Sequence, residues 1–191
     1  YPIAAPFLVF ATQNPIEQEG TYPLPEAELD RFMFQIDVTY PSYDDEVEIV
    51  KTTTGTYEPV LKKLLDSEKI LEYQSLVHRV PVSDHVAAYA VRVARSTRPD
   101  DPGAPAAVKN GVSWGVGPRA SQYLVLGAKS RAVLNGRYTP MTEDIDAIAP
   151  AVLKHRIVLN FRAEAEGVRS EDIIQEILEG TDPLAEAHLA V

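Results

Sequence analysis

The sequence predicts a mainly α-helical chain with a small α/β portion at its start. Residues 6–12, PFLVFAT, are an almost unbroken apolar run, and residues 33–38, MFQIDV, alternate enough for a second strand. From residue 41 onward, apolar residues recur instead at the three- and four-residue spacing of amphipathic helices. We therefore expect two strands first and a helical domain after them.

The two predicted strands are expected to belong to a parallel sheet. A strand that is apolar on both faces, like residues 6–12, is typical of a parallel sheet covered by helices. A proline-rich loop follows it, and Pro25 predicts the start of a short helix that ends near Arg31, before the second strand. Two strands and one helix cannot bury both faces of a sheet, so we expect residues 1–40 to be the C-terminal part of a larger α/β domain.

Residues 41–191 are expected to form the helical domain. Helices are predicted over residues 44–54, 67–77, 118–134 and 170–179, and onward from Ser83 and Thr142, with Ser83, Thr142 and Ser170 as N-caps. Residues 98–117 are rich in proline and glycine and predict a long loop, and RIVLNF at residues 156–161 predicts a short strand.

The composition argues against several classes of function. The formal net charge of -10 argues against general nucleic-acid binding, which needs a basic surface. The absence of cysteine excludes disulfides and thiolate sites, and it suits a protein of the reducing cytoplasm. The four histidines lie far apart in the sequence, so no metal site is predicted, and no apolar run approaches the length of a membrane span.

Asn14 and Arg31 are candidates for contact with a phosphate group. Asn14 follows the carboxyl end of the first predicted strand, where α/β proteins bind ligands, and the alternative is an ordinary Asn-Pro turn. Arg31 is the only basic residue among the first fifty, which contain ten aspartates and glutamates. Its planar guanidinium suits a phosphate of a neighbouring subunit, whereas the local charges favour an ion pair with Glu28 or Asp30. Both interpretations stay open for each residue.

Arg119 is the third candidate. It occupies the second position of the helix predicted over residues 118–134, where the positive end of the helix dipole disfavours a cation. Free backbone N–H groups and an added guanidinium form a phosphate-binding arrangement, and the alternative is a solvated arginine whose stem packs on the preceding loop. The cations of KHR, residues 154–156, are interpreted as an ordinary helix C-terminus.

A longer pattern links these residues, although motifs that cradle a nucleotide are absent. The sequence contains no G-x-x-x-x-G-K-[ST] loop and no apolar strand that ends in paired acids. The stretch FLVFATQNPIEQEGTYPLPEAELDRFMFQIDVTYPSYDDEVEIV closely resembles the second half of the nucleotide-binding domain of MoxR-type AAA+ ATPases. GPRASQYLVLGAKSRAVLNGR and DIDAIAPAVLKHRI resemble the helical lid of these ATPases. The resemblance covers about residues 6–161, lacks the Walker A and Walker B segments, and includes a loop at 98–117 that is longer and more polar than expected.

The resemblance implies a role for each candidate residue. Asn14 takes the place of sensor 1, which contacts the γ-phosphate or the attacking water. Arg31 takes the place of the arginine finger, and Arg119 that of sensor 2, which serves the nucleotide of its own or of the neighbouring subunit. The implied fold is a partial AAA+ parallel sheet over residues 1–40, followed over residues 41–191 by a helical-bundle lid domain with a C-terminal extension.

The resemblance also implies the activity of a longer parent protein. The parent would bind ATP and Mg²⁺ between the subunits of a hexameric or similar ring in the cytoplasm. It would couple ATP hydrolysis to chaperone-like remodelling or maturation of an unidentified client protein, without a nucleic-acid partner. We expect the present chain alone to bind no ATP tightly and to be inactive, because it lacks the phosphate cradle. A helical protein-interaction module that hydrolyses nothing is the alternative.

Overall fold

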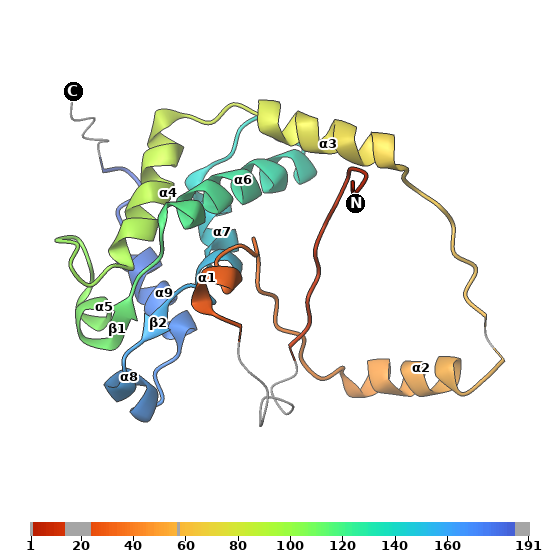
Figure 1. Ribbon diagram of the computed structural model, residues 1–191, viewed down its shortest axis with the longest axis horizontal. Helices are drawn as coiled ribbons and strands as arrows, with labels where there is room; N and C mark the ends of the chain where they lie inside the picture. The colour runs from red at the N-terminus through yellow and green to blue at the C-terminus, as the bar shows by residue number, and fades with distance from the viewer. Residues whose placement is uncertain (1, 14–23, 57, 186–191) are drawn as a thin grey trace.

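The computed structural model describes residues 2–13, 24–56 and 58–185, and it confirms the mainly helical fold class (Figure 1). In chain order the elements are α1 (Glu26–Leu29), α2 (Tyr43–Thr53), α3 (Ser67–Arg79), α4 (Asp84–Ser96), α5 (Ala106–Gly111), β1 (Val112–Trp114), α6 (Pro118–Leu134), α7 (Thr142–Leu153), β2 (Val158–Leu159), α8 (Phe161–Ala165) and α9 (Ser170–Gly180).

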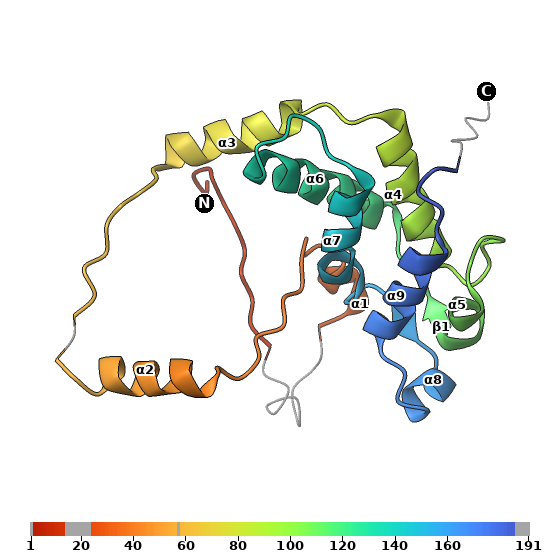
Figure 2. The same cartoon turned by 180° about the vertical axis from the view of Figure 1, so that it is seen from behind.

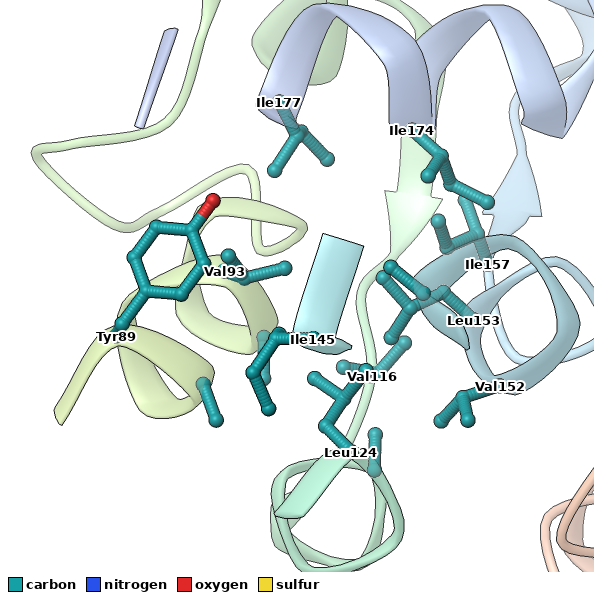
Figure 3. Packing of buried hydrophobic residues seen from close by; sticks show 14 of the residues in the cluster. Tyr89, Val93, Val116, Leu124, Ile145, Val152, Leu153, Ile157, Ile174 and Ile177 are labelled. Carbon is teal, nitrogen blue, oxygen red and sulfur yellow. The ribbon is translucent and has the colours of Figure 1, made fainter. Parts of the chain in front are cut away.

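The hydrophobic core lies between α4, α6, α7 and α9, and the residues from α5 to Val116 close one side of it (Figure 3). The apolar stripe of α4 that the sequence predicts is buried as expected, with Tyr89 and Val93 at 1% and 0% exposure. Facing it, α6 buries mostly small residues, which lets its neighbours approach closely. The labelled core residues of Figure 3 are Tyr89, Val93, Val116, Leu124, Ile145, Val152, Leu153, Ile157, Ile174 and Ile177.

The helix ends agree with the sequence prediction at some places and differ by one residue at others. The hydroxyl of Ser83 accepts a backbone N–H at 3.3 Å and caps α4, as predicted. Thr142 is wrong as the cap of α7, because the helix begins at Thr142 itself. The backbone N–H of Met141 instead donates to the carboxylate of Asp144 at 2.9 Å. Ser170 is displaced in the same way at the start of α9.

The two predicted strands of a parallel sheet do not form within the described residues. Residues 6–12 are extended, but no described strand lies beside them, and Phe10 is 90% exposed. In residues 33–38, the backbone N–H of Gln35 donates to the carbonyl of Ala151 in α7 at 2.9 Å, rather than to a neighbouring strand. The physical reason is that a strand becomes regular only when its backbone groups pair with another strand.

The prediction of a long loop at residues 98–117 is wrong, because this stretch contains α5 and β1. β1 pairs antiparallel with β2, with Val112 opposite Leu159, which confirms the short strand predicted within residues 156–161. Val108 and Val112 are buried in the core, at 0% and 5% exposure. These two buried valines, four residues apart, anchor α5 and β1 to the core. The proline and glycine residues around them hide this apolar spacing in the sequence.

α2 and the extended residues 2–13 lie apart from the helical bundle in both views (Figures 1 and 2). α2 is capped by Ser42, whose hydroxyl accepts the N–H of Asp45 at 3.2 Å, but none of its residues is buried. The buried hydrophobic residues of the described chain run from Val80 to Ile177. The packed body of the described structure is therefore the helical region that follows α3.

Candidate functional site

The candidate site centres on residues 30–37, hereafter the docked segment, which follows α1 and lies against α6 and α7 (Figure 1). α1 begins after Pro25 and is a single turn, and the N–H groups of Arg31 and Phe32 extend this turn by bonding to carbonyls three residues earlier. The segment then runs across the two lid helices. Phe34 reaches α6 at Gly127, where an added Cβ would lie only 3.3 Å from the Phe34 ring.

Arg156, just after α7, makes the most extensive contact with the docked segment. Its side chain is 1% exposed, and its Nε donates to the Asp30 carboxylate at 3.0 Å. One Nη also donates to the carbonyl oxygen of Asp30 at 2.9 Å and to that of Phe32, and the other donates to the carbonyl of Met33 at 3.4 Å. The guanidinium also lies 5.2 Å from the centre of the Tyr123 ring. Burial lowers the pKa of Arg156, and the hydrogen bond to Asp30 opposes this effect.

The two residues before Arg156 also hold the docked segment. Lys154 forms an ion pair with Asp37, and its side chain is 8% exposed. His155 Nε2 lies 3.1 Å from the carbonyl oxygen of Phe32, so this nitrogen carries the proton. Burial, and next the positive charge of Arg156, lower the pKa of His155, which is therefore neutral near pH 7. The sequence interpretation of KHR as an ordinary helix end missed this docking role.

Arg31 presents its side chain to solvent while its backbone is held. The side chain is 68% exposed, and its ion pair with Glu28 is long, at 3.6 Å. The Tyr123 hydroxyl donates to the carbonyl oxygen of Arg31 at 3.2 Å. The structural alternative for Arg31, an ion pair with Glu28 or Asp30, is thus present with Glu28 only as an exposed pair, a kind that contributes little to stability.

Arg119 stands at the start of α6, directly after Pro118, as the sequence predicts. Its guanidinium forms an ion pair with Asp30 and is 43% exposed. Asp30 therefore binds two arginines, Arg119 at the start of α6 and Arg156 just after α7. The carboxylate of Asp30 thus supplies an anionic partner for Arg119, a cation at a helix N-terminus. Asp30 is also the residue directly before Arg31.

The structure thus brings two of the three predicted site residues together. Arg31 and Arg119 are both partly exposed, and Arg119 pairs with Asp30, the residue directly before Arg31. Asn14 lies outside the described residues. Two permanently charged, planar guanidinium groups can each donate two parallel hydrogen bonds to phosphate oxygens.

The described ranges contain neither a membrane-spanning helix nor a metal-binding cluster. No helix there is long and apolar enough to cross a membrane. No group of three or more His, Asp or Glu side chains there is arranged to hold a metal ion.

Comparison with known proteins gives consistent matches. Residues 1–34 match the family described as ATPase family associated with various cellular activities (AAA), and residues 104–177 match the AAA lid domain. The chain is 40% identical over 179 residues to a protein named Chaperone MoxR1 from Mycobacterium tuberculosis, a match that covers 94% of this chain and 47% of that protein. It is 32% identical to Protein MoxR of Methylorubrum extorquens over an alignment of 165 positions, and this match covers 79% of this chain and 47% of that protein.

One solved structure is also similar over nearly the whole chain. A crystal structure from Cytophaga hutchinsonii, of a protein assigned as an ATPase, aligns with a TM-score of 0.89 at 37% identity. The alignment covers 95% of this chain and 56% of that one. The chain thus spans about half the length of the curated relatives it matches.

Proposed function

Because the chain belongs to the MoxR-type AAA+ ATPases, we propose that it supplies three nucleotide-contacting residues to a longer ATPase. Asn14 is sensor 1, Arg31 is the arginine finger and Arg119 is sensor 2. The longer protein binds Mg-ATP between the subunits of a ring and couples hydrolysis to chaperone-like remodelling of a client. The present chain lacks the phosphate cradle and alone neither binds ATP tightly nor hydrolyses it.

The observation that best supports this proposal is the presentation of Arg31. Its backbone is anchored by lid side chains, while its guanidinium is exposed and weakly paired. A side chain that acts on a phosphate of another subunit needs both a backbone held in a fixed position and a charged group that is accessible from outside. Phosphoryl transfer is accelerated mainly by positive charge placed against the developing negative oxygens, which an arginine provides without any change of protonation.

The proposal divides the chain into two domains. Residues 1–40 are the end of the nucleotide-binding domain, and residues 41–191 are the lid domain with its C-terminal extension. The docked segment supports an intimate contact between them, because its residues bond to α7 and to the residues that follow α7. The exposed apolar side chains of Phe7 to Phe10, 59–90% accessible, would be covered by the remainder of the nucleotide-binding domain in the longer protein.

The test is the substitution Arg31→Ala in the longer protein, with ATP binding and hydrolysis measured separately. We expect the dissociation constant for ATP to stay within about 2-fold and hydrolysis to fall by about 10³ to 10⁵, the range for an arginine supplied by a neighbouring molecule. Mixing these subunits with subunits that lack the Walker A lysine should restore part of the activity. In mixed rings an intact site then meets an intact arginine.

A matched control is available in α8. Arg162 is 78% exposed and pairs with Glu166, four residues later at the end of α8, much as Arg31 pairs with the nearby Glu28. Arg162→Ala should leave hydrolysis unchanged. Unchanged hydrolysis in Arg31→Ala would contradict the proposed role. It would leave the ion pair with Glu28 as the function of Arg31.

A non-hydrolysing interaction module is the second candidate. The exposed apolar side chains of residues 7–10 favour it, because such patches mark surfaces that bind other proteins. It predicts that the longer protein shows no ATP turnover above that of an Arg31→Ala preparation. Turnover that depends on Arg31 would exclude it.

A further inference from the structure

Arg156 holds the backbone on both sides of Arg31. It donates to the carbonyl oxygens of Asp30 and Phe32, the residues before and after Arg31, and also to that of Met33. The carbonyl of Arg31 itself accepts a hydrogen bond from Tyr123, whose ring lies beside the Arg156 guanidinium. Four consecutive carbonyl groups are thus bound by two lid side chains.

The Arg156 side chain that makes these contacts is buried, whereas the guanidinium of Arg31 is exposed to solvent. The Arg156 side chain is 1% exposed, and that of Arg31 is 68% exposed. Arg156 also donates to the carbonyl of Val152 in α7, the helix that ends just before it, so the guanidinium is held by α7 as well as by the docked segment. A buried arginine in a fixed orientation defines the position of the groups it binds more closely than any exposed pair can.

We infer that Arg156 is a positioning residue for Arg31, which sets the place and direction from which Arg31 leaves the lid surface. This inference rests on the proposed role of Arg31 as an arginine finger. Arg156 does not contact the nucleotide; it acts through the backbone of residues 30–33. Asp30 contributes to the same positioning, because its carboxylate accepts a hydrogen bond from Nε of Arg156 at 3.0 Å and so orients the guanidinium.

The inference predicts a defect that is transmitted to the neighbouring subunit. If Arg156 only stabilised its own lid, its replacement would damage the subunit that carries the change. If it positions Arg31, the damaged site belongs to the next subunit of the ring. Misplacing a catalytic group by about 1 Å can cost about 10²-fold in rate, with substrate binding retained.

The experiment uses Arg156→Gln and Arg156→Lys in the longer protein, with kcat, KM and the ATP dissociation constant measured. We expect Arg156→Gln to lower kcat by about 10²-fold and to leave ATP affinity within about 2-fold. Arg156→Lys keeps the charge but not the planar set of donors, so its kcat should lie between those of Gln and wild type. Mixed with subunits that lack the Walker A lysine, Arg156→Gln subunits should recover hydrolysis, as Arg31→Ala subunits do.

The matched control is Arg137→Gln. Arg137 also binds a buried carboxylate, that of Asp144, through two hydrogen bonds of 2.6 and 2.5 Å, but it forms no hydrogen bond with the described docked segment. It should lower thermal stability without a selective loss of kcat. The double variant Arg31→Ala, Arg156→Gln should be no slower than Arg31→Ala, because both changes remove the same contribution.

The outcomes separate the two proposals. If Arg31→Ala abolishes hydrolysis but Arg156→Gln does not reduce kcat, the positioning role is wrong and the finger stands. If mixed rings fail to rescue Arg156→Gln, or if Arg137→Gln loses kcat equally, Arg156 is a structural residue of its own subunit. If Arg31→Ala hydrolyses normally, the proposed function itself fails. Circular dichroism checks that each variant is folded, and Arg156→Lys carries the test if the Gln variant is not.

Discussion

The pKa of a buried acidic residue in this chain depends on the arginines that bind it, and Asp144 is the clearest case. Its side chain is 3% exposed, and it accepts two hydrogen bonds from Arg137, with Arg131 at 3.3 Å. The hydrogen bond from Arg137 lowers the pKa of Asp144 most, against the opposing effect of burial. A carboxyl group whose pKa is lower in the folded state stabilises the fold above its unfolded pKa.

The stability of the chain should therefore fall as the pH drops below about 5 towards the folded pKa of Asp144. We expect Asp144→Asn to lower the free energy of unfolding at pH 7 by about 1–3 kcal/mol and to flatten this dependence. Urea unfolding between pH 3 and 7 measures both. Asp172→Asn is the control, because Asp172 pairs with Arg169 in the same capping arrangement but is 53% exposed. Equal pH profiles for the two variants would contradict the argument.

At the residue scale, the sequence identified Arg31 with its partner Glu28, and it identified Arg119 without its partner Asp30. Arg31 and Arg119 could be selected from local charge and helix position, and the structure pairs Arg31 with Glu28 and Arg119 with Asp30. The contact of Asp30 with Arg156 spans more than a hundred residues of chain. No local pattern encodes such a pairing, and the helix-end interpretation of residues 154–156 was therefore locally reasonable and incomplete.

At the scale of elements, the longer helices and the short strand β2 were predictable, whereas α5, β1 and the fate of the two strand-like segments at residues 6–12 and 33–38 were not. α6 begins and ends where the sequence predicts, because Pro118 favours a first helical position and Gly136, with φ of 71°, suits the turn after the helix. These signals are local. A strand depends on a partner that another part of the chain must supply, so residues 6–12 and 33–38 carry strand-like patterns without forming strands among the described residues.

The close approach of the docked segment to α6 depends on Gly127. A Cβ there would lie 2.5 Å from the Cδ1 of Ile148 and 3.3 Å from the ring of Phe34. Gly127→Leu should displace Phe34, lower the free energy of unfolding by about 1–3 kcal/mol and expose residues 30–37 to proteases. Urea unfolding and limited proteolysis measure these effects.

Gln122→Leu, at an exposed position of the same helix, is the control for Gly127→Leu. It should change the free energy of unfolding by no more than about 0.5 kcal/mol. Equal losses in the two variants would show that the Phe34 contact is unimportant.

At the scale of the whole molecule, the packed body and the outlying segments should differ in local stability. The buried stripes of α4, α6 and α7 lie in the common core, whereas α2 buries no residue and Phe10 is 90% exposed. Hydrogen exchange measured by mass spectrometry should show strong protection in the first group and rapid exchange in α2 and residues 7–10. Slow exchange in residues 7–10 of the isolated chain would mean that they are covered, against this description.

The double pairing of Asp30 has a thermodynamic consequence for the proposed ATPase. The Asp30 carboxylate forms ion pairs with both Arg119 and Arg156. An anion that binds Arg119 in place of Asp30 would therefore strengthen the interaction of Asp30 with Arg156. Binding at one arginine then changes the free energy at the other, and such coupling is reciprocal by necessity. If Arg119 binds a phosphate as proposed, that binding would in this way be linked through a single side chain to the contacts of Arg156 with the backbone around Arg31.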